Sequence, residues 1–190
     1  MKKKFAAIIS LMVIMGMLPV AVVSLSGKSV SIGTSTPDSA SDKEKTVCAC
    51  AAVMCESGFC DEALRAALII AETNLAAGFD EDINYSDKEL YNRIVGIYDS
   101  EKEKYISFDG KTDYIPHSSC SNGVTVKSEK YTYLSPVASP WDCECRNYSA
   151  DISCEGASIY GINRLCEKGF SAEEALGYYL PGSKIMLTKQ

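Results

Sequence analysis

The clearest periodic pattern in the chain is CDEALRAALIIAETNLAAG, residues 60–78, in which apolar side chains recur every three or four positions. This is the spacing of one face of an α-helix. Asp61 suits the start of such a helix, and Gly78 suits its end. The apolar stripe consists of Ala63, Leu64, Ala67, Leu68, Ala71 and Leu75. We therefore predict a helix that buries this stripe in the core.

Three further stretches are predicted to be helical. SDKELYNRIVGIYDSE (residues 86–101) and SAEEALGYYL (residues 171–180) begin with Ser86 and Ser171, each followed three positions later by a glutamate. This is the capping-box pattern of a helix N-terminus. EGASIYGINRLCEKG (residues 155–169) also has helical spacing, and its final glycine suits a helix C-terminus.

Residues 103–140 carry strand and turn signals instead. The best strand candidate is KYTYLSPV, residues 130–137, where aromatic and β-branched side chains gather. Helices and strands together predict an α+β (mixed α/β) fold. We expect a single extracytoplasmic domain whose helices pack around a small mixed or antiparallel sheet.

The N-terminus has the order of a signal sequence. Three lysines at positions 2–4 precede an apolar run over residues 5–23, which is long enough to span a bilayer. No clean small-x-small cleavage site follows the run. We therefore predict that residues 1–24 are an uncleaved signal anchor, which keeps the protein in the cell membrane with its domain outside the cytoplasm. Secretion after signal cleavage is the alternative.

Residues 25–46 are rich in serine and threonine and poor in large apolar groups, which predicts a linker. Residues 47–190 remain, about 145 residues and enough for one domain. The chain has 25 acidic and 19 basic residues, a formal net charge of −6. This balance argues against a nucleic-acid partner for the domain, because a polyanion would attract the opposite sign.

Nine cysteines follow the apolar run, and two interpretations of them stay open. Outside the cytoplasm such density indicates disulfides, although the odd number leaves one thiol over. Cysteine is also a soft zinc ligand, and two C-x-C pairs are present, but C-x-x-C is absent. The cysteines are at positions 48, 50, 55, 60, 120, 143, 145, 154 and 166.

Four stretches, in order, resemble the stage II sporulation protein D family, which includes the LytB-type amidase enhancers. EALRAALIIAETN (residues 62–74) is similar to that family's E-A-L-K-A-Q-A-V-A-A-R-T-Y helix. HSSCSNGVT (residues 117–125) resembles its H-S-x-x-x-G-G-x-T segment, and TYLSPVASPWD (residues 132–142) the P-Y-L-x-x-V-x-D-P-x-D stretch after it. GASIYGINRLCEKGFSAEEALGYYLPGSKI (residues 156–185) is similar to the family's G-M-S-Q-Y-G to Y-Y-P-G-x-x-I region. The resemblance covers about residues 47–185.

The resemblance implies a membrane-anchored lytic transglycosylase that cuts peptidoglycan glycan strands stripped of stem peptides during sporulation engulfment. Its implied partners are these strands, a cell-wall amidase and other engulfment proteins, and the chemistry requires no cofactor. The family's catalytic glutamate falls on Glu56 in VMCES. One carboxyl group suffices because the substrate's own C6 hydroxyl is the nucleophile. Near neutral pH such an acid needs apolar shelter, for which Val53, Met54 and Phe59 are nearby candidates.

His117 is the single histidine of the chain. The resemblance places it on a substrate-facing loop, where it could orient a sugar, help a proton move or bind zinc. A zinc site would use His117 and Cys120, with Cys143, Cys145 or Cys154 as a further ligand. The alternative is an ordinary hydrogen-bonding histidine.

Hydroxyl, amide and aromatic side chains are further candidates for contact with a glycan. Stabilisation of turns and packing in the core are the alternatives for them. The candidates are Ser118, Ser119, Asn122, Thr125, Tyr160, Tyr178 and Tyr179.

The chain departs from the family at several polar positions. Glu72 stands where the family has arginine, and Ala67 and Ile159 stand where it has glutamine. These losses favour an alternative function, a non-catalytic glycan-binding module that enhances a partner amidase. A third possibility is a cysteine-rich secreted structural protein without affinity for glycans.

Overall fold

The computed structural model describes residues 41–79, 83 and 85–187. The predicted signal anchor, residues 1–24, and most of the predicted linker lie outside the described residues. Within the described part of the chain, no helix combines the length and the apolar character that a membrane crossing requires. The fold described below is that of the predicted domain and the few residues before it.

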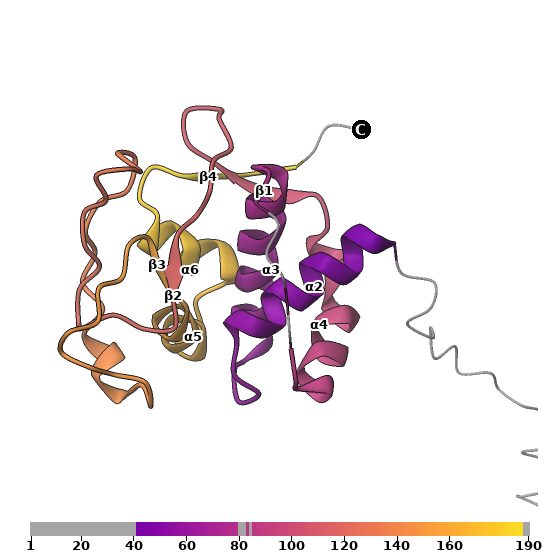
Figure 1. Cartoon of the computed structure of the whole chain (residues 1–190), viewed down its shortest axis with the longest axis horizontal. Coiled ribbons are helices and arrows are strands. Elements are labelled where there is room, and N and C mark those ends of the chain that lie inside the picture. Colours follow the sequence, from indigo (N-terminus) through magenta and orange to yellow (C-terminus); the bar gives the residue numbers. More distant parts are fainter. Residues whose placement is uncertain (1–40, 80–82, 84, 188–190) are drawn as a thin grey trace, which may run out of the picture. The chain divides into compact units, whose positions relative to one another are not determined.

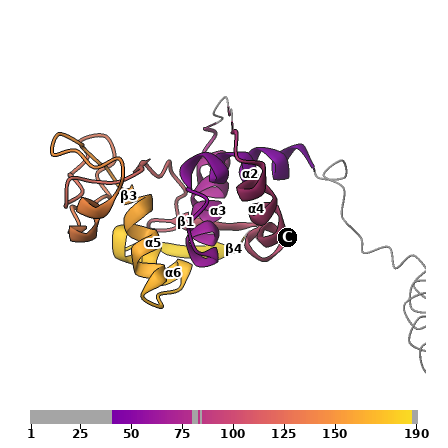
Figure 2. The same ribbon diagram turned by 90° about the horizontal axis from the view of Figure 1, so that it is seen from below.

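Helix α3 (Asp61–Ala76) is at the centre of the domain, and residues 66–74 are buried without interruption. Helices pack on it from two sides (Figures 1 and 2). On one side lie α2 (Asp42–Met54) and α4 (Lys88–Glu101), and on the other α5 (Ile159–Glu167) and α6 (Ala172–Tyr179). The predicted central helix is confirmed. Its burial extends beyond one stripe because neighbours cover both sides.

Helix α2 was not predicted from the sequence pattern. The Ser41 hydroxyl accepts a hydrogen bond from the backbone N–H of Glu44 at 3.2 Å, and Asp42 and Glu44 are acidic residues in the first turn. Both features stabilise a helix N-terminus. The predicted linker was therefore wrong for residues 42–46, which form the first turn of a helix.

Helix α4 is confirmed, but its cap is not the predicted one. Asp87 rather than Ser86 is the N-cap residue, and its carboxylate accepts from the backbone N–H of Leu90 at 3.0 Å. Aspartate and serine cap equally well, so sequence alone does not choose between neighbours. The apolar face of α4 buries Leu90, Ile94 and Tyr98.

The strands form two small sheets. Strands β1 (Lys104–Ser107) and β4 (Lys184–Leu187) pair antiparallel, with Lys104 opposite Leu187. Strands β2 (His117–Ser118) and β3 (Ala157–Ser158) pair in parallel. The α+β class is thus confirmed, with one antiparallel and one parallel pair in the described residues in place of one sheet.

The strand predicted over residues 130–137 is wrong, because this stretch turns. The backbone N–H of Leu134 donates to the carbonyl of Tyr131 at 3.0 Å, and the Ser128 hydroxyl accepts from the N–H of Tyr131 at 2.9 Å. Tyr131 and Leu134 are both buried, three positions apart, which does not fit the alternation of a strand.

Helices α5 and α6 are confirmed, and so is the capping box of Ser171 with Glu174. The helices meet the 3₁₀ helix η2 (Pro140–Glu144) through Gly161, which faces the hydroxyls of Tyr179 and Ser139. Those two hydroxyls are 2.6 Å apart. A methyl group at Gly161 would overlap both oxygens, so this junction requires glycine.

Candidate functional site

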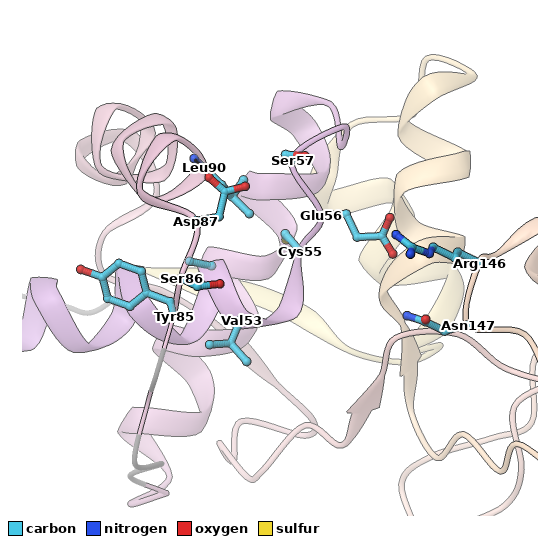
Figure 3. Close-up of a pocket in the computed structure, with 11 residues that line it drawn as sticks. Val53, Cys55, Glu56, Ser57, Tyr85, Ser86, Asp87, Leu90, Arg146 and Asn147 are labelled. Atoms are coloured by element: carbon cyan, nitrogen blue, oxygen red, sulfur yellow. Dashed lines mark hydrogen bonds between the residues drawn. The ribbon is translucent and has the colours of Figure 1, made fainter.

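An open groove of about 580 Å³ lies among the described residues. It lies between the end of α2, the turn that leads to α3, the start of α4, and the loop after η2 (Figure 3). Polar side chains dominate its lining. They include Glu56, Ser57, Tyr85, Asp87, Arg146 and Asn147.

Glu56 sits in the turn that joins α2 to α3. Its carbonyl accepts a hydrogen bond from the N–H of Phe59 at 3.0 Å, which closes the turn. The side chain is exposed and points toward Arg146 and Asn147 (Figure 3). The expected apolar shelter is weak, because Val53 is itself 55% exposed and Phe59 is buried in the core.

Arg93 of α4 fixes the Glu56 turn from outside. Its guanidinium donates to the carbonyl of Ser57 at 2.9 Å, to that of Phe59 at 3.0 Å, and to the Asp61 carboxylate at 2.7 Å. One side chain thus satisfies two turn carbonyls and the first residue of α3. Arg93 is more than 30 positions away in sequence, so no local pattern predicts these contacts.

His117 lies on β2, and the described residues that line the Glu56 groove do not include it. It is half-buried, and its Nδ1 is 3.2 Å from the carbonyl oxygen of Ile115. Asn74 of α3 holds the same residue: its amide accepts from the Ile115 N–H at 2.7 Å and donates to the Ile115 carbonyl at 3.1 Å. The observed contacts of His117 are therefore those of an ordinary hydrogen-bonding histidine, which was the alternative to a functional one.

A chain of contacts still connects the His117 segment with the Glu56 turn. The rings of Phe59 and Tyr160 meet edge to face, with centroids 6.4 Å apart. The backbone N–H of Tyr160 donates to the Ser119 carbonyl at 2.9 Å. The two predicted catalytic residues thus belong to neighbouring parts of the fold without lining one groove.

Five predicted glycan contacts remain at least partly accessible. The Asn122 amide donates to the carbonyl of Ala150 at 3.3 Å, and the Tyr178 hydroxyl to that of Ala138 at 2.8 Å. Neither side chain is among the described residues that line the groove, and the same holds for His117. The five are Ser118, Ser119, Asn122, Tyr160 and Tyr178.

Thr125 and Tyr179 are buried, each about 1% exposed. The Thr125 hydroxyl accepts from the N–H of Val137 at 2.8 Å. The Tyr179 hydroxyl bonds to Ser139 and accepts from the Trp141 indole at 3.0 Å, and burial raises its pKa. Thr125 thus stabilises a turn and Tyr179 packs in the core. Both are too buried to contact a glycan.

Two of the predicted zinc ligands are neighbours. Burial raises the pKa of Cys120 to about 12, and the neighbouring Cys145 acts in the same direction. The exposed Cys143 thiol instead donates to the Pro140 carbonyl at 3.1 Å. Within residues 41–79, 83 and 85–187, no group of three or more His, Cys, Asp or Glu side chains could hold a metal ion. Zinc at His117 stays a prediction, and no step below depends on a metal.

Sequence reasoning missed the cationic and amide side of the groove. Arg146 and Asn147 directly follow the second C-x-C pair, and the sequence analysis considered only the cysteines of this segment. Asp142 was also missed. Its carboxylate is buried and accepts from the N–H and the hydroxyl of Ser121, at 2.7 and 2.6 Å. A buried aspartate between Trp141 and Cys143 has no local pattern that reveals its role.

The departures from the family pattern lie in the interior. Glu72 is 3% exposed, pairs with Lys43 at 2.8 Å, and accepts from the Tyr98 hydroxyl at 3.0 Å. It therefore links α3 to α2 and α4. Ala67 and Ile159 are buried among apolar neighbours. None of the three faces the groove that contains Glu56.

Comparison of the chain with protein-family models and with curated proteins finds no match.

Proposed function

We propose that the protein is a peptidoglycan lytic transglycosylase in which Glu56 is the single acid and base. The observation that carries this proposal is the location of Glu56. Its exposed carboxylate lines an open groove of about 580 Å³ whose other lining groups are mostly polar. Sugar polymers are bound by such grooves, because each ring offers many hydroxyl and amide groups. The resemblance to the sporulation family adds the substrate class, denuded glycan strands outside the cytoplasm during engulfment.

The chemistry needs two proton transfers at one carboxyl group. Protonated Glu56 gives its proton to the glycosidic oxygen as the bond to C1 breaks. The resulting carboxylate then takes the proton of the C6 hydroxyl on the same sugar, whose oxygen closes the 1,6-anhydro ring. Glu56 returns to its starting state, and no water enters the product.

Arg146 and Asn147 are the proposed orienting groups. Both line the groove, and the Glu56 side chain points toward them (Figure 3). A guanidinium and an amide donate hydrogen bonds to sugar hydroxyls, to acetamido carbonyls and to the lactyl carboxylate of muramic acid. Their contacts would place the scissile oxygen above Glu56.

His117 takes no step in this mechanism. It lies outside the described lining of the groove, and its ring nitrogen faces the Ile115 carbonyl at 3.2 Å. In the proposal it helps to hold the loop that precedes Cys120. The catalytic assistance expected of His117 stays a prediction that this mechanism does not use.

The test is digestion of isolated cell walls from which an amidase has removed the stem peptides. The wild-type protein should release anhydro-muramyl products, identified by mass spectrometry. Glu56→Gln should lower the release at least 100-fold, because the amide can neither donate nor accept the required proton. Glu129→Gln is the matched control, since Glu129 is an exposed glutamate outside the groove.

Unchanged release by Glu56→Gln, with folding intact by circular dichroism, would remove Glu56 from the mechanism. Absence of product from the wild-type protein at high enzyme concentration would remove the enzymatic proposal itself.

A second candidate function is a non-catalytic glycan-binding module that enhances a partner amidase. The weak apolar shelter of Glu56 favours it, because an exposed carboxylate resembles a binding group more than a proton donor. This candidate predicts retention on denuded glycan, no anhydro product, and faster release of stem peptides when an amidase is added. Arg146→Ala should weaken retention under either function.

A further inference from the structure

Cys60 and Cys166 come from distant parts of the chain and meet next to the Glu56 turn. Cys60 is the N-cap residue of α3, and Cys166 lies in the last turn of α5. The N–H of Cys60 donates to the side-chain oxygen of Asn163 at 3.0 Å. Asn163 and Cys166 are three positions apart on α5 and therefore share a face of this helix. The backbone contact at Asn163 thus brings Cys166 beside Cys60.

The two side chains interact directly. The Cys166 thiol interacts electrostatically with Cys60, and both residues, which are free cysteines in this structure, pack against the core. Cys166 is 7% exposed, whereas Cys60 is partly accessible. Cys55, which is buried, also interacts electrostatically with Cys60. Cys60 is therefore the more accessible residue of the pair, and Cys166 the more protected one.

We propose that Cys60 and Cys166 form a disulfide that fixes the start of α3 to α5. The cross-link would hold the turn that carries Glu56, because this turn closes at Phe59, directly before Cys60. It goes beyond the proposed function, because it holds for an enzyme and for a glycan-binding module alike. It uses the oxidising environment expected outside the cytoplasm.

The oxidant is a small-molecule or protein disulfide. The accessible Cys60 thiolate attacks one of its sulfurs, forms a mixed disulfide and releases one thiol. The Cys166 thiolate then attacks the Cys60 sulfur and releases the second thiol. The two cysteines lose two protons and two electrons, and the oxidant gains them. Burial raises the pKa of Cys166 to about 12, so Cys166 suits the second, intramolecular attack, where proximity offsets a low thiolate fraction.

Peptide mapping tests the cross-link in the full-length exported protein. Thiols are blocked before lysis, and the protein is digested without reductant by trypsin and a glutamate-specific protease. These cleavages separate Ser57–Glu62, which contains Cys60 alone, from Leu165–Glu167, which contains Cys166 alone. We expect the two peptides as one disulfide-linked mass that separates on reduction.

Blocked Cys60 and Cys166, or a link from Cys60 to Cys55 or from Cys166 to any other cysteine, would overturn the proposal. The digestion distinguishes Cys55 because cleavage after Glu56 puts it on a different peptide.

Thermal unfolding gives an independent readout. Reductant should lower the melting temperature of the wild-type protein by roughly 5–15 °C, because a bridge across roughly a hundred residues restricts the unfolded chain. Cys60→Ser, Cys166→Ser and the double variant should all melt near the reduced wild type and respond little to reductant. Cys143→Ser is the matched control at an exposed cysteine and should keep the full response. Equal responses of Cys143→Ser and Cys166→Ser would contradict the cross-link.

Discussion

The helical half of the domain, residues 41–103, and the loop half, residues 108–158, are stabilised in different ways. In the helical half, α3 buries residues 66–74 in full between other helices. In the loop half, single side chains hold the backbone. Asp142 binds Ser121, and Thr125 binds Val137. Apolar burial tolerates small changes, whereas a loop that depends on a few polar contacts fails when one is lost.

The largest expected effect comes from Gly161, where α5 meets the loop half. In Gly161→Ala the new methyl group overlaps the Tyr179 and Ser139 hydroxyls, and backbone shifts must relieve the overlap. We expect the free energy of unfolding in urea to fall by about 3 kcal/mol or more. Gly177→Ala on α6 is the control, because among the described residues nothing beyond its chain neighbours and its own helix backbone lies within 4 Å of the added methyl group. A loss at Gly161 no larger than at Gly177 would contradict the packing described here.

Asn74 is the main polar contact between the two halves near His117. Asn74→Ala removes both hydrogen bonds to Ile115, so the buried Ile115 N–H loses its side-chain acceptor and the Ile115 carbonyl keeps the contact with His117 Nδ1. The expected loss of unfolding free energy is about 2–4 kcal/mol. Amide exchange over residues 115–118 should accelerate more than exchange within α4. The exposed Asn92→Ala should change stability by less than about 0.5 kcal/mol, and uniform acceleration throughout the domain would argue against a local role for Asn74.

Alkaline pH should separate the buried thiol of Cys55 in the helical half from the exposed thiol of Cys143 in the loop half. Burial raises the pKa of Cys55 from 9.0 to about 12. Above pH 9 the unfolded chain loses this proton while the folded chain keeps it, so stability falls as pH rises from 9 toward 12. For one such thiol the slope is about 1.4 kcal/mol per pH unit.

Urea unfolding in reductant at pH 8 and pH 10 measures this effect. Cys55→Ala should show a smaller loss between the two pH values than the wild type. Cys143→Ala, at an exposed cysteine, should show the wild-type loss. Identical pH dependence of both variants would mean that Cys55 is accessible in the folded protein.

Arg93 should have the smallest effect on stability and a larger effect on function. Arg93→Gln removes the donors to the Ser57 and Phe59 carbonyls at a partly exposed site, which costs about 1 kcal/mol. If the Glu56 turn carries the proposed chemistry, product release should fall about tenfold or more, because Glu56 loses its fixed position. The exposed Lys88→Gln on the same helix is the control. Wild-type release by Arg93→Gln would show that the turn keeps its geometry without the clamp.

Helices α3, α4, α5 and α6 follow from sequence patterns, whereas α2 and the loop half do not. The apolar stripe of α3 and the capping box at Ser171 are local patterns, so they predict their elements. The contacts of Thr125 and Asp142 join residues 12 to 21 positions apart. Such contacts leave no periodic signal, and the tyrosine-rich stretch at residues 130–137 was therefore wrongly predicted as a strand.

The candidate site divides in the same way. Glu56 was predicted from its place before α3, and it does line a groove. Arg146 and Asn147 complete that groove from about 90 positions away, a tertiary proximity that no local motif encodes. A functional role for His117 was predicted from the resemblance of its segment to the sporulation family, yet such a resemblance says nothing of the direction in which the side chain points.

The two hydrogen bonds between the Asn74 side chain and the Ile115 backbone have a consequence for insertions and deletions. The amide takes both backbone groups of one residue, much as a neighbouring strand would, so it sets the alignment of the following segment against α3. An extra residue in the turn around Gly110 would enlarge that turn and leave the Asn74–Ile115 contact and the segment after it unchanged. An extra residue between Ile115 and β2 would shift the pairing with β3 by one position and exchange the faces on which His117 and Ser118 emerge. Length variation in related chains should therefore accumulate before the anchor and be rare after it.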